Sequence, residues 1–134
     1  MIPTTNTILS ADLTVESQPS KTYRMLTDRN IINGMCDGLD AMRQAVFKIL
    51  NTERYQNIIY SWNYGVELNG LYGEPVTYVC PELQRRITEA LLQDDRITAV
   101  SGFEFDTSKK RTVRVTFTVH TIFGNVDGEK AVEF

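Results

Sequence analysis

The sequence predicts an α+β fold in which two main helices pack on an antiparallel sheet. Apolar residues recur every three or four positions in two stretches of the first two thirds of the chain, whereas apolar and polar residues alternate along the last third. The 134 residues are 42% hydrophobic, which is enough for a single buried core. We therefore expect one domain over residues 21–134, preceded by an extended N-terminal arm over residues 1–20, which are rich in Thr, Ser, Pro and Asn.

The first ordered elements are expected to be a strand over residues 21–27 and a helix that begins after Asp37 and ends near Thr52. A turn at Asn33-Gly34 should separate them. Asp37 can cap free backbone N–H groups, and Asp40 adds favourable negative charge to the first turn of the helix. The apolar stripe of this helix comprises Leu39, Met42, Val46, Ile49 and Leu50. The opposite side, expected to face water, carries Arg43, Gln44 and Lys48.

A second helix is expected to start between Thr77 and Pro81, with the proline in its first turn, and to stop at Asp94-Asp95. Its apolar stripe is Val79, Leu83, Ile87 and Leu91. The segment between the helices, residues 53–75, follows neither the helical nor the strand period. Its many aromatic and glycine residues indicate short elements and tight turns.

From Arg96 onwards the pattern is that of β-strands. The clearest strand has one buried face, made by Val113, Val115, Phe117 and Val119. Asp127-Gly128 has the composition of a two-residue hairpin turn, because both central positions of a type I′ turn need a positive φ. Residues 129–134 would then return as an antiparallel strand, which makes a hairpin at the C-terminal end.

Composition and charge exclude several classes of protein. The net charge is −3, and the one basic cluster, Lys109-Lys110-Arg111, is typical of a solvated turn, so we expect no nucleic-acid partner. No apolar run of about 18 residues is present and residues 1–10 do not resemble a signal peptide, so we expect no membrane span and no export. Cys36 and Cys80 are expected to be free thiols in a reducing cytoplasm, and no metal or cofactor is expected.

Catalytic chemistry finds little support among the side chains. His120 is the only histidine, and a catalytic role would need a nucleophile such as Ser or Cys near it in space. Neither a G-x-S-x-G nor an H-E-x-x-H motif is present. A glycosidase needs two carboxyl groups, and the candidates are Glu53, Glu67, Glu74, Asp94 and Asp95. Their spacing singles out no pair, and Glu53 is better explained as an ion-pair partner of Arg54 that anchors the segment after the helix. The sequence therefore predicts that the protein is not an enzyme.

Two features favour docking to other proteins. The first is an aromatic set typical of protein interfaces, comprising Tyr55, Tyr60, Trp62, Tyr64 and Tyr72. The second is the terminal strand over residues 130–134, whose edge carries only two charged residues and is suited to the addition of a strand from a partner. An ordinary edge that is paired within the domain remains an equally good interpretation of that strand.

Several runs resemble the small baseplate wedge proteins of contractile tails, a family called baseplate lysozyme-like whose members initiate the tail sheath. The resemblance is strongest to the branch from Gram-positive phages and phage-like tail particles. It spans residues 21–124 and rests on residues 37–41, 49–55, 60–65, 82–97 and 117–124. Many members carry Glu-Pro-Arg after the first helix, whereas here Glu53 is followed directly by Arg54.

The resemblance implies a structural baseplate component, six copies of which surround the tail tube. It would join the wedge proteins to the first ring of the sheath, and it would also meet tube or hub proteins. The wedge contacts implied are Arg54, Tyr60, Trp62, Tyr64 and Gly65. The sheath contacts implied are Lys130, Ala131, Val132, Glu133 and Phe134, on a C-terminal hairpin that resembles a sheath docking domain.

Assembly would take place in the bacterial host cytoplasm and would leave the protein in the tail baseplate. One alternative function is a peptidoglycan hydrolase of the tail, and another is an adaptor that binds one peptide strand outside any tail. Whether the particle is a phage, a defective prophage or a tail-like bacteriocin stays open.

Overall fold

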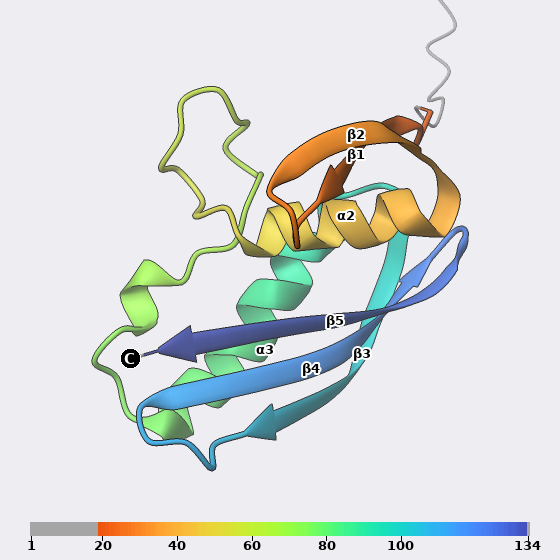
Figure 1. The fold of residues 1–134 in the computed structure, drawn as a ribbon. Helices are drawn as coiled ribbons and strands as arrows, with labels where there is room; N and C mark the ends of the chain where they lie inside the picture. The colour runs from red at the N-terminus through yellow and green to blue at the C-terminus, as the bar shows by residue number, and fades with distance from the viewer. Residues whose placement is uncertain (1–18, 134) are drawn as a thin grey trace, which may run out of the picture.

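The computed structural model describes residues 19–133 and confirms the α+β class. Most of the expected N-terminal arm, residues 1–18, and the terminal Phe134 lie outside the described residues. The elements, shown in Figure 1, are β1 (Thr22–Leu26), β2 (Ile31–Cys36), α2 (Gly38–Leu50), a short 3-10 helix η1 (Asn69–Leu71), α3 (Val76–Leu92), β3 (Ile97–Asp106), β4 (Thr112–Thr121) and β5 (Gly124–Glu133).

The strands form two antiparallel sheets. β3, β4 and β5 make a three-stranded sheet in that order, with β4 in the centre, and α2 and α3 cover one of its faces (Figure 1). β1 and β2 form a separate hairpin that packs against α2. Helix α2 therefore lies between the hairpin and the main sheet, which gives it two covered sides.

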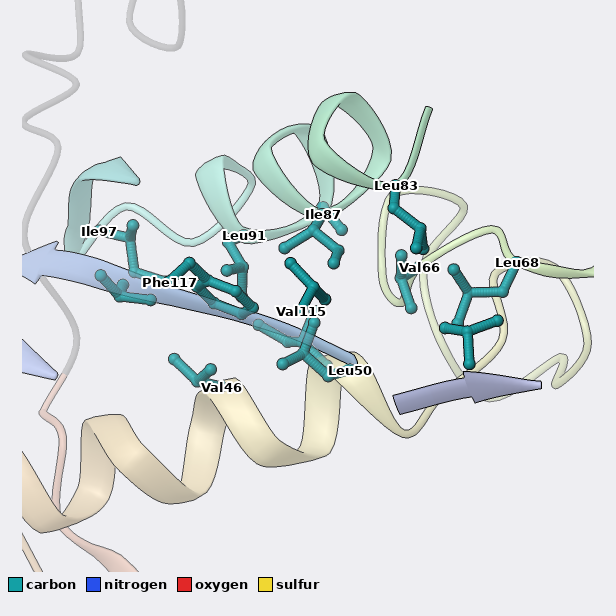
Figure 2. Packing of buried hydrophobic residues seen from close by; sticks show 14 of the residues in the cluster. Val46, Leu50, Val66, Leu68, Leu83, Ile87, Leu91, Ile97, Val115 and Phe117 are labelled. Atoms are coloured by element: carbon teal, nitrogen blue, oxygen red, sulfur yellow. The ribbon is translucent and has the colours of Figure 1, made fainter. Parts of the chain in front are cut away.

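The core lies between the two helices and the main sheet, as Figure 2 shows. The stripes predicted on both helices point into it: Met42, Val46, Ile49 and Leu50 of α2 are buried, and so is every member of the α3 stripe. Leu39 is partly buried at the border. The sheet contributes the four β4 residues predicted from alternation, Val113, Val115, Phe117 and Val119.

The boundaries of the second helix differ slightly from the prediction. Helix α3 begins at Val76, with Pro75 as its N-cap residue, so Pro81 lies in the second turn rather than the first. A proline there has no N–H to donate to the carbonyl four residues earlier. The predicted end is confirmed, since the helix finishes at Leu92 and Asp94 N donates to Leu91 O.

The predicted turn at Asn33-Gly34 is wrong. The chain turns at residues 27–30, and both residues lie inside β2. The register moves by one between the pairs Tyr23↔Met35 and Met25↔Ile32, so an extra residue is accommodated there as a β-bulge. Gly34 takes φ 74°, a left-handed conformation that glycine adopts without a steric penalty.

The predicted turn at Asp127-Gly128 is also wrong. The connection between β4 and β5 is Ile122-Phe123, and β5 already starts at Gly124. Gly128 pairs with Phe117 in the middle of the hairpin. A Cβ atom at Gly128 would lie 2.6 Å from Cζ of Phe117, so glycine is needed here because an aromatic ring crosses the strand, not because the chain turns.

Gln44 was expected to face water, yet it joins α2 to the β1–β2 hairpin. Its Oε1 accepts a hydrogen bond of 2.8 Å from Met25 N, and its Nε2 donates one of 2.7 Å to Tyr23 O. The thiol of Cys36 lies 3.7 Å from the same Oε1 atom. One side chain thus satisfies two backbone groups of β1 in the stretch where the bulge disturbs the pairing.

We expect Gln44→Ala to loosen the β1–β2 hairpin while the main sheet stays intact. The change leaves two backbone groups of β1 without their partner, which costs about 1–3 kcal/mol for each group that stays shielded from water. Hydrogen exchange should show faster exchange of Met25 N–H and of neighbouring hairpin amides, with β4 unchanged. Gln84→Ala, on the exposed side of α3, is the control. Equal exchange rates in the wild type and Gln44→Ala would contradict the assignment.

Candidate functional site

The segment between α2 and η1 leaves the body of the protein as a long loop (Figure 1). We call residues 55–65 the aromatic loop. Three of its apolar side chains are almost fully exposed: Ile58 (102%), Ile59 (86%) and Trp62 (81%). Large apolar groups gathered on a projecting segment mark a site for contact with another protein.

The base of the aromatic loop is closed by backbone contacts. Arg54 N donates to Val66 O at 3.2 Å, and Val66 N donates to Thr52 O at 2.9 Å. Gly65 makes this close approach possible, because a Cβ atom there would lie 2.6 Å from Thr52 O. Gly65 itself is buried, so it shapes the loop from within.

Glu53 anchors the loop, but not through the predicted ion pair with Arg54. Its Oε1 atom accepts hydrogen bonds of 3.0 Å from both Leu68 N and Asn69 N, at the start of η1. A carboxylate that receives two backbone N–H groups is well satisfied. Glu53 therefore has a structural task in the described fold, which argues against its role as a catalytic carboxyl group.

Arg54 points inward to α3. Its side chain is only 9% exposed and forms an ion pair of 3.2 Å with Glu89. Its Nε atom is buried without a hydrogen-bond partner among the described residues. In this conformation Arg54 connects the base of the aromatic loop to α3. The exposed side chains of the loop, such as Ile58, Ile59 and Trp62, provide the surface that a partner would contact.

Two aromatic pairs organise the loop. Tyr60 and Tyr64 are stacked with ring centroids 4.7 Å apart, and Tyr55 meets Trp62 edge-on at 5.7 Å. Tyr64 is half-buried, and this burial together with the nearby Tyr60 raises the pKa of its hydroxyl. Of the residues that the resemblance implies as wedge contacts, only Tyr60 and Trp62 are therefore freely accessible.

The second candidate surface is the outer edge of β5, to which no other strand of residues 19–133 pairs. All ten residues of β5 pair with β4 in one unbroken register. The opposite edge of the sheet, β3, is interrupted by two register shifts, and bulges of this kind discourage the addition of a strand. The β5 edge is thus the regular one.

Only alternate residues of β5 present their main chain to this edge. The two-residue turn makes Thr121 and Gly124 a hydrogen-bonded pair, so alternation directs the backbone groups of Ala131 and Glu133 outward. Lys130 and Val132 belong to the pairs that bond to β4, and Val132 is buried in the core. Among residues 130–133 of the predicted sheath-contact segment, Ala131 and Glu133 are therefore the residues able to bind an added strand.

The side chain of Lys130 lies on the inner face of the sheet. Its ammonium group reaches Asn51 Oδ1, at the end of α2, over 3.4 Å. Burial lowers the pKa of this ammonium group, and the nearby negative charge of Glu53 opposes the shift. An inward-facing charge on an edge strand disfavours indiscriminate pairing with apolar strands.

The remaining carboxyl candidates show no arrangement for acid–base catalysis. Asp94 holds Arg96 in an ion pair of 2.7 Å. Burial of Asp94 favours its neutral form, but the hydrogen bonds from Arg96 outweigh this and lower its pKa. Glu67, Glu74 and Asp95 are exposed. Among residues 19–133 no group of acidic, histidine or cysteine side chains could hold a metal ion, and no helix there is long and apolar enough to cross a membrane.

His120 has partners that the sequence did not reveal. Ser101 Oγ lies 2.7 Å from its Nε2, and Asn125 Oδ1 lies 2.9 Å from its Nδ1. These side chains come from β3, β4 and β5 and are brought together only by the pairing of the strands. A serine hydrolase would need, in addition, a sheltered substrate site with donors for the oxyanion, whereas these contacts are exposed. We interpret Ser101, His120 and Asn125 as a row of hydrogen-bonded side chains that links the three strands across the sheet.

Comparison with known proteins gives two matches. Residues 19–124 match the family described as contractile injection system sheath initiator. The chain is also 38% identical over 128 residues to the phage-like element PBSX protein XkdS of Bacillus subtilis (strain 168), an alignment that covers 90% of each chain. The family match includes the whole aromatic loop and stops at the first residue of β5.

Proposed function

Because this chain belongs to the contractile injection system sheath initiator family, we propose that it joins the baseplate of a contractile tail to the first ring of the sheath. A structural role in such a tail follows from the family, and the two exposed surfaces support a specific division of labour. The aromatic loop would bind the baseplate wedge, and the β5 edge would bind the sheath. Six copies around the tube, contacts with tube or hub proteins, assembly in the host cytoplasm and the absence of catalysis complete the proposal.

The single observation that carries the sheath contact is the regular edge of β5, which pairs with no further strand of residues 19–133. An extended segment of a sheath subunit would add there as a fourth strand, with main-chain hydrogen bonds for affinity and alternate side chains for register. The outward groups of Asn125, Asp127, Glu129, Ala131 and Glu133 provide the hydrogen-bonding positions. Lys130 on the inner face makes the edge selective.

The wedge contact is supported by the exposure of the loop tip and by its firm base. Ile58, Ile59 and Trp62 offer apolar area, of which tryptophan is the type most often found to dominate binding energy. The contacts of Glu53 and Arg54 hold the base in place before any partner arrives. A preorganised loop loses less conformational freedom on binding, so more of the contact energy becomes affinity.

Ala131→Pro tests the strand-addition mechanism. Deleting residues 129–134 would also remove Val132 from the core, so a lost interaction could then reflect unfolding. Proline at position 131 instead removes one outward N–H and fills its place with a ring, while pairing with β4 is retained. We expect sheath binding to weaken by more than about tenfold, since a hydrogen bond is lost and the neighbouring strand is displaced.

The measurement is co-purification of the sheath protein of the same tail, co-expressed with wild-type or variant chain. Ala131→Thr is the control, because it alters the side chain and keeps the N–H group. Thermal unfolding should show that both variants remain folded. Full sheath binding by a folded Ala131→Pro chain would rule out strand addition at this edge.

A further inference from the structure

A basic cluster lies at the end of the main sheet where β5 finishes. The turn between β3 and β4 carries Lys109, Lys110 and Arg111, all three exposed. Together with Tyr72, Thr112 and Glu133 they line an open hollow of about 470 Å³. Thr112 pairs directly with Glu133, so the cluster lies at the point where a strand added to β5 would enter or leave the sheet (Figure 1).

The three cations of the cluster, Lys109, Lys110 and Arg111, form no ion pair within the described part of the chain. The one acidic residue that lines the hollow is Glu133. Three adjacent cations at one place in a chain of net charge −3 therefore create a local positive potential.

The charge along the β5 edge changes sign at this point. Asp127 and Glu129 are exposed on the outer face of the strand, and Glu129 is already paired with Arg114. A strand that pairs with β5 would lie beside Asp127 and the neutralised Glu129 along most of its length. It would reach the basic cluster only at the Glu133 end of β5. Opposite charges on neighbouring strands attract and like charges repel.

We propose that this cluster binds an acidic segment of the sheath chain, located just outside the stretch that pairs with β5. The inference rests on the proposed function, because it assumes that β5 receives a strand. Carboxylate side chains of the partner would form ion pairs with Lys109, Lys110 and Arg111, and the Tyr72 hydroxyl could donate a further hydrogen bond. Since the cluster lies at one end of β5 only, it also sets the direction of the added strand.

A protein segment suits this hollow better than a nucleic acid does. Three cations give only a weak phosphate contact, and a longer polyanion would continue onto the acidic face of β5. A short acidic segment joined to a paired strand avoids this repulsion. The strand also holds the segment near the cluster, which raises its effective concentration there.

The first test reverses the charge of the cluster. The chain with Lys109→Glu, Lys110→Glu and Arg111→Glu is co-expressed with the sheath protein, and sheath binding is compared with that of the wild type at about 50 and 500 mM NaCl. We expect binding at about 50 mM NaCl to fall at least about tenfold in the variant. Added salt should weaken binding by the wild type but strengthen the residual binding of the variant, because it screens attraction in the first case and repulsion in the second. The matched control, Lys21→Glu, Arg24→Glu and Arg29→Glu, makes the same charge change at exposed positions around β1 and should retain binding.

The second test identifies the partner groups directly. A carbodiimide activates a carboxylate, and attack by a lysine amine then forms an amide bond as the carbodiimide leaves as its urea. In the purified complex, Lys109 and Lys110 should cross-link to Asp or Glu residues of the sheath chain. The inference would be overturned if the cluster variant bound sheath as well as the wild type does and the wild-type complex showed no cross-links at Lys109 or Lys110. Strand addition at β5 would then still stand. If the wild-type chain did not bind the sheath protein at all, both the strand addition and the acidic-segment contact would be overturned.

Discussion

Gly128→Ala is expected to destabilise the domain by about 3 kcal/mol, which lowers the melting temperature by roughly 10 °C for a chain of this size. The added methyl group would lie 2.6 Å from Cζ of Phe117, a side chain that is itself buried in the core. Neither partner can move cheaply, because Phe117 also packs on Phe103 with ring centroids 5.3 Å apart. The measurement is thermal or chemical unfolding of the purified chain.

Two further variants make this prediction specific. Gly70→Ala is the control, since its Cβ would meet only the guanidinium group of Arg86, at 3.4 Å, and its stability should change by less than about 1 kcal/mol. Phe117→Leu removes the ring and should make Gly128→Ala much less costly in the double variant, as expected for two residues in contact. A Gly128→Ala chain that melts with the wild type would show that the strand relaxes around the ring.

Gly128 also shows where sequence patterns stop being informative. Asp-Gly is a strong hairpin signal, but a glycine is equally required where a bulky side chain crosses a strand. Only the register between β4 and β5, which places Phe117 opposite Gly128, separates the two cases. The apolar stripes of both helices and the alternation of β4 could be predicted, because burial of a periodic face depends on local sequence alone.

The candidate surfaces were predictable in part for the same reason. The aromatic composition of the loop marked it as a docking element, and its exposure agrees with that. The inward orientation of Arg54 was not predictable, because its partner Glu89 stands 35 residues further along the chain. The contacts of His120 with Ser101 and Asn125 likewise depend on strand pairing, which single-residue patterns do not specify.

Replacing Ile58, Ile59 and Trp62 together by serine is expected to reduce binding to the baseplate proteins by at least about 100-fold, or about 2.7 kcal/mol. These side chains are more than four-fifths exposed in the free protein, so their loss removes contact area from an interface and little from the core. The fold should therefore melt within about 5 °C of the wild type, since surface changes rarely exceed about 0.5 kcal/mol each. Co-purification with the co-expressed baseplate wedge proteins measures the binding.

The triple-serine variant must be tested for binding to both the wedge proteins and the sheath, because only a loss confined to the wedge proteins assigns the aromatic loop to them. If the aromatic loop serves the wedge and β5 serves the sheath, the triple-serine chain should lose the wedge proteins and still bind sheath. The matched control replaces Tyr23, Ile32 and Met35, which are also exposed apolar residues but lie on the β1–β2 hairpin, and it should bind both partners. If the loop variant still bound the wedge proteins, the aromatic loop would not be part of the wedge interface. A simultaneous loss of both partners in a folded chain would show that the two surfaces do not act separately, since a change confined to the loop would then have reached the β5 edge.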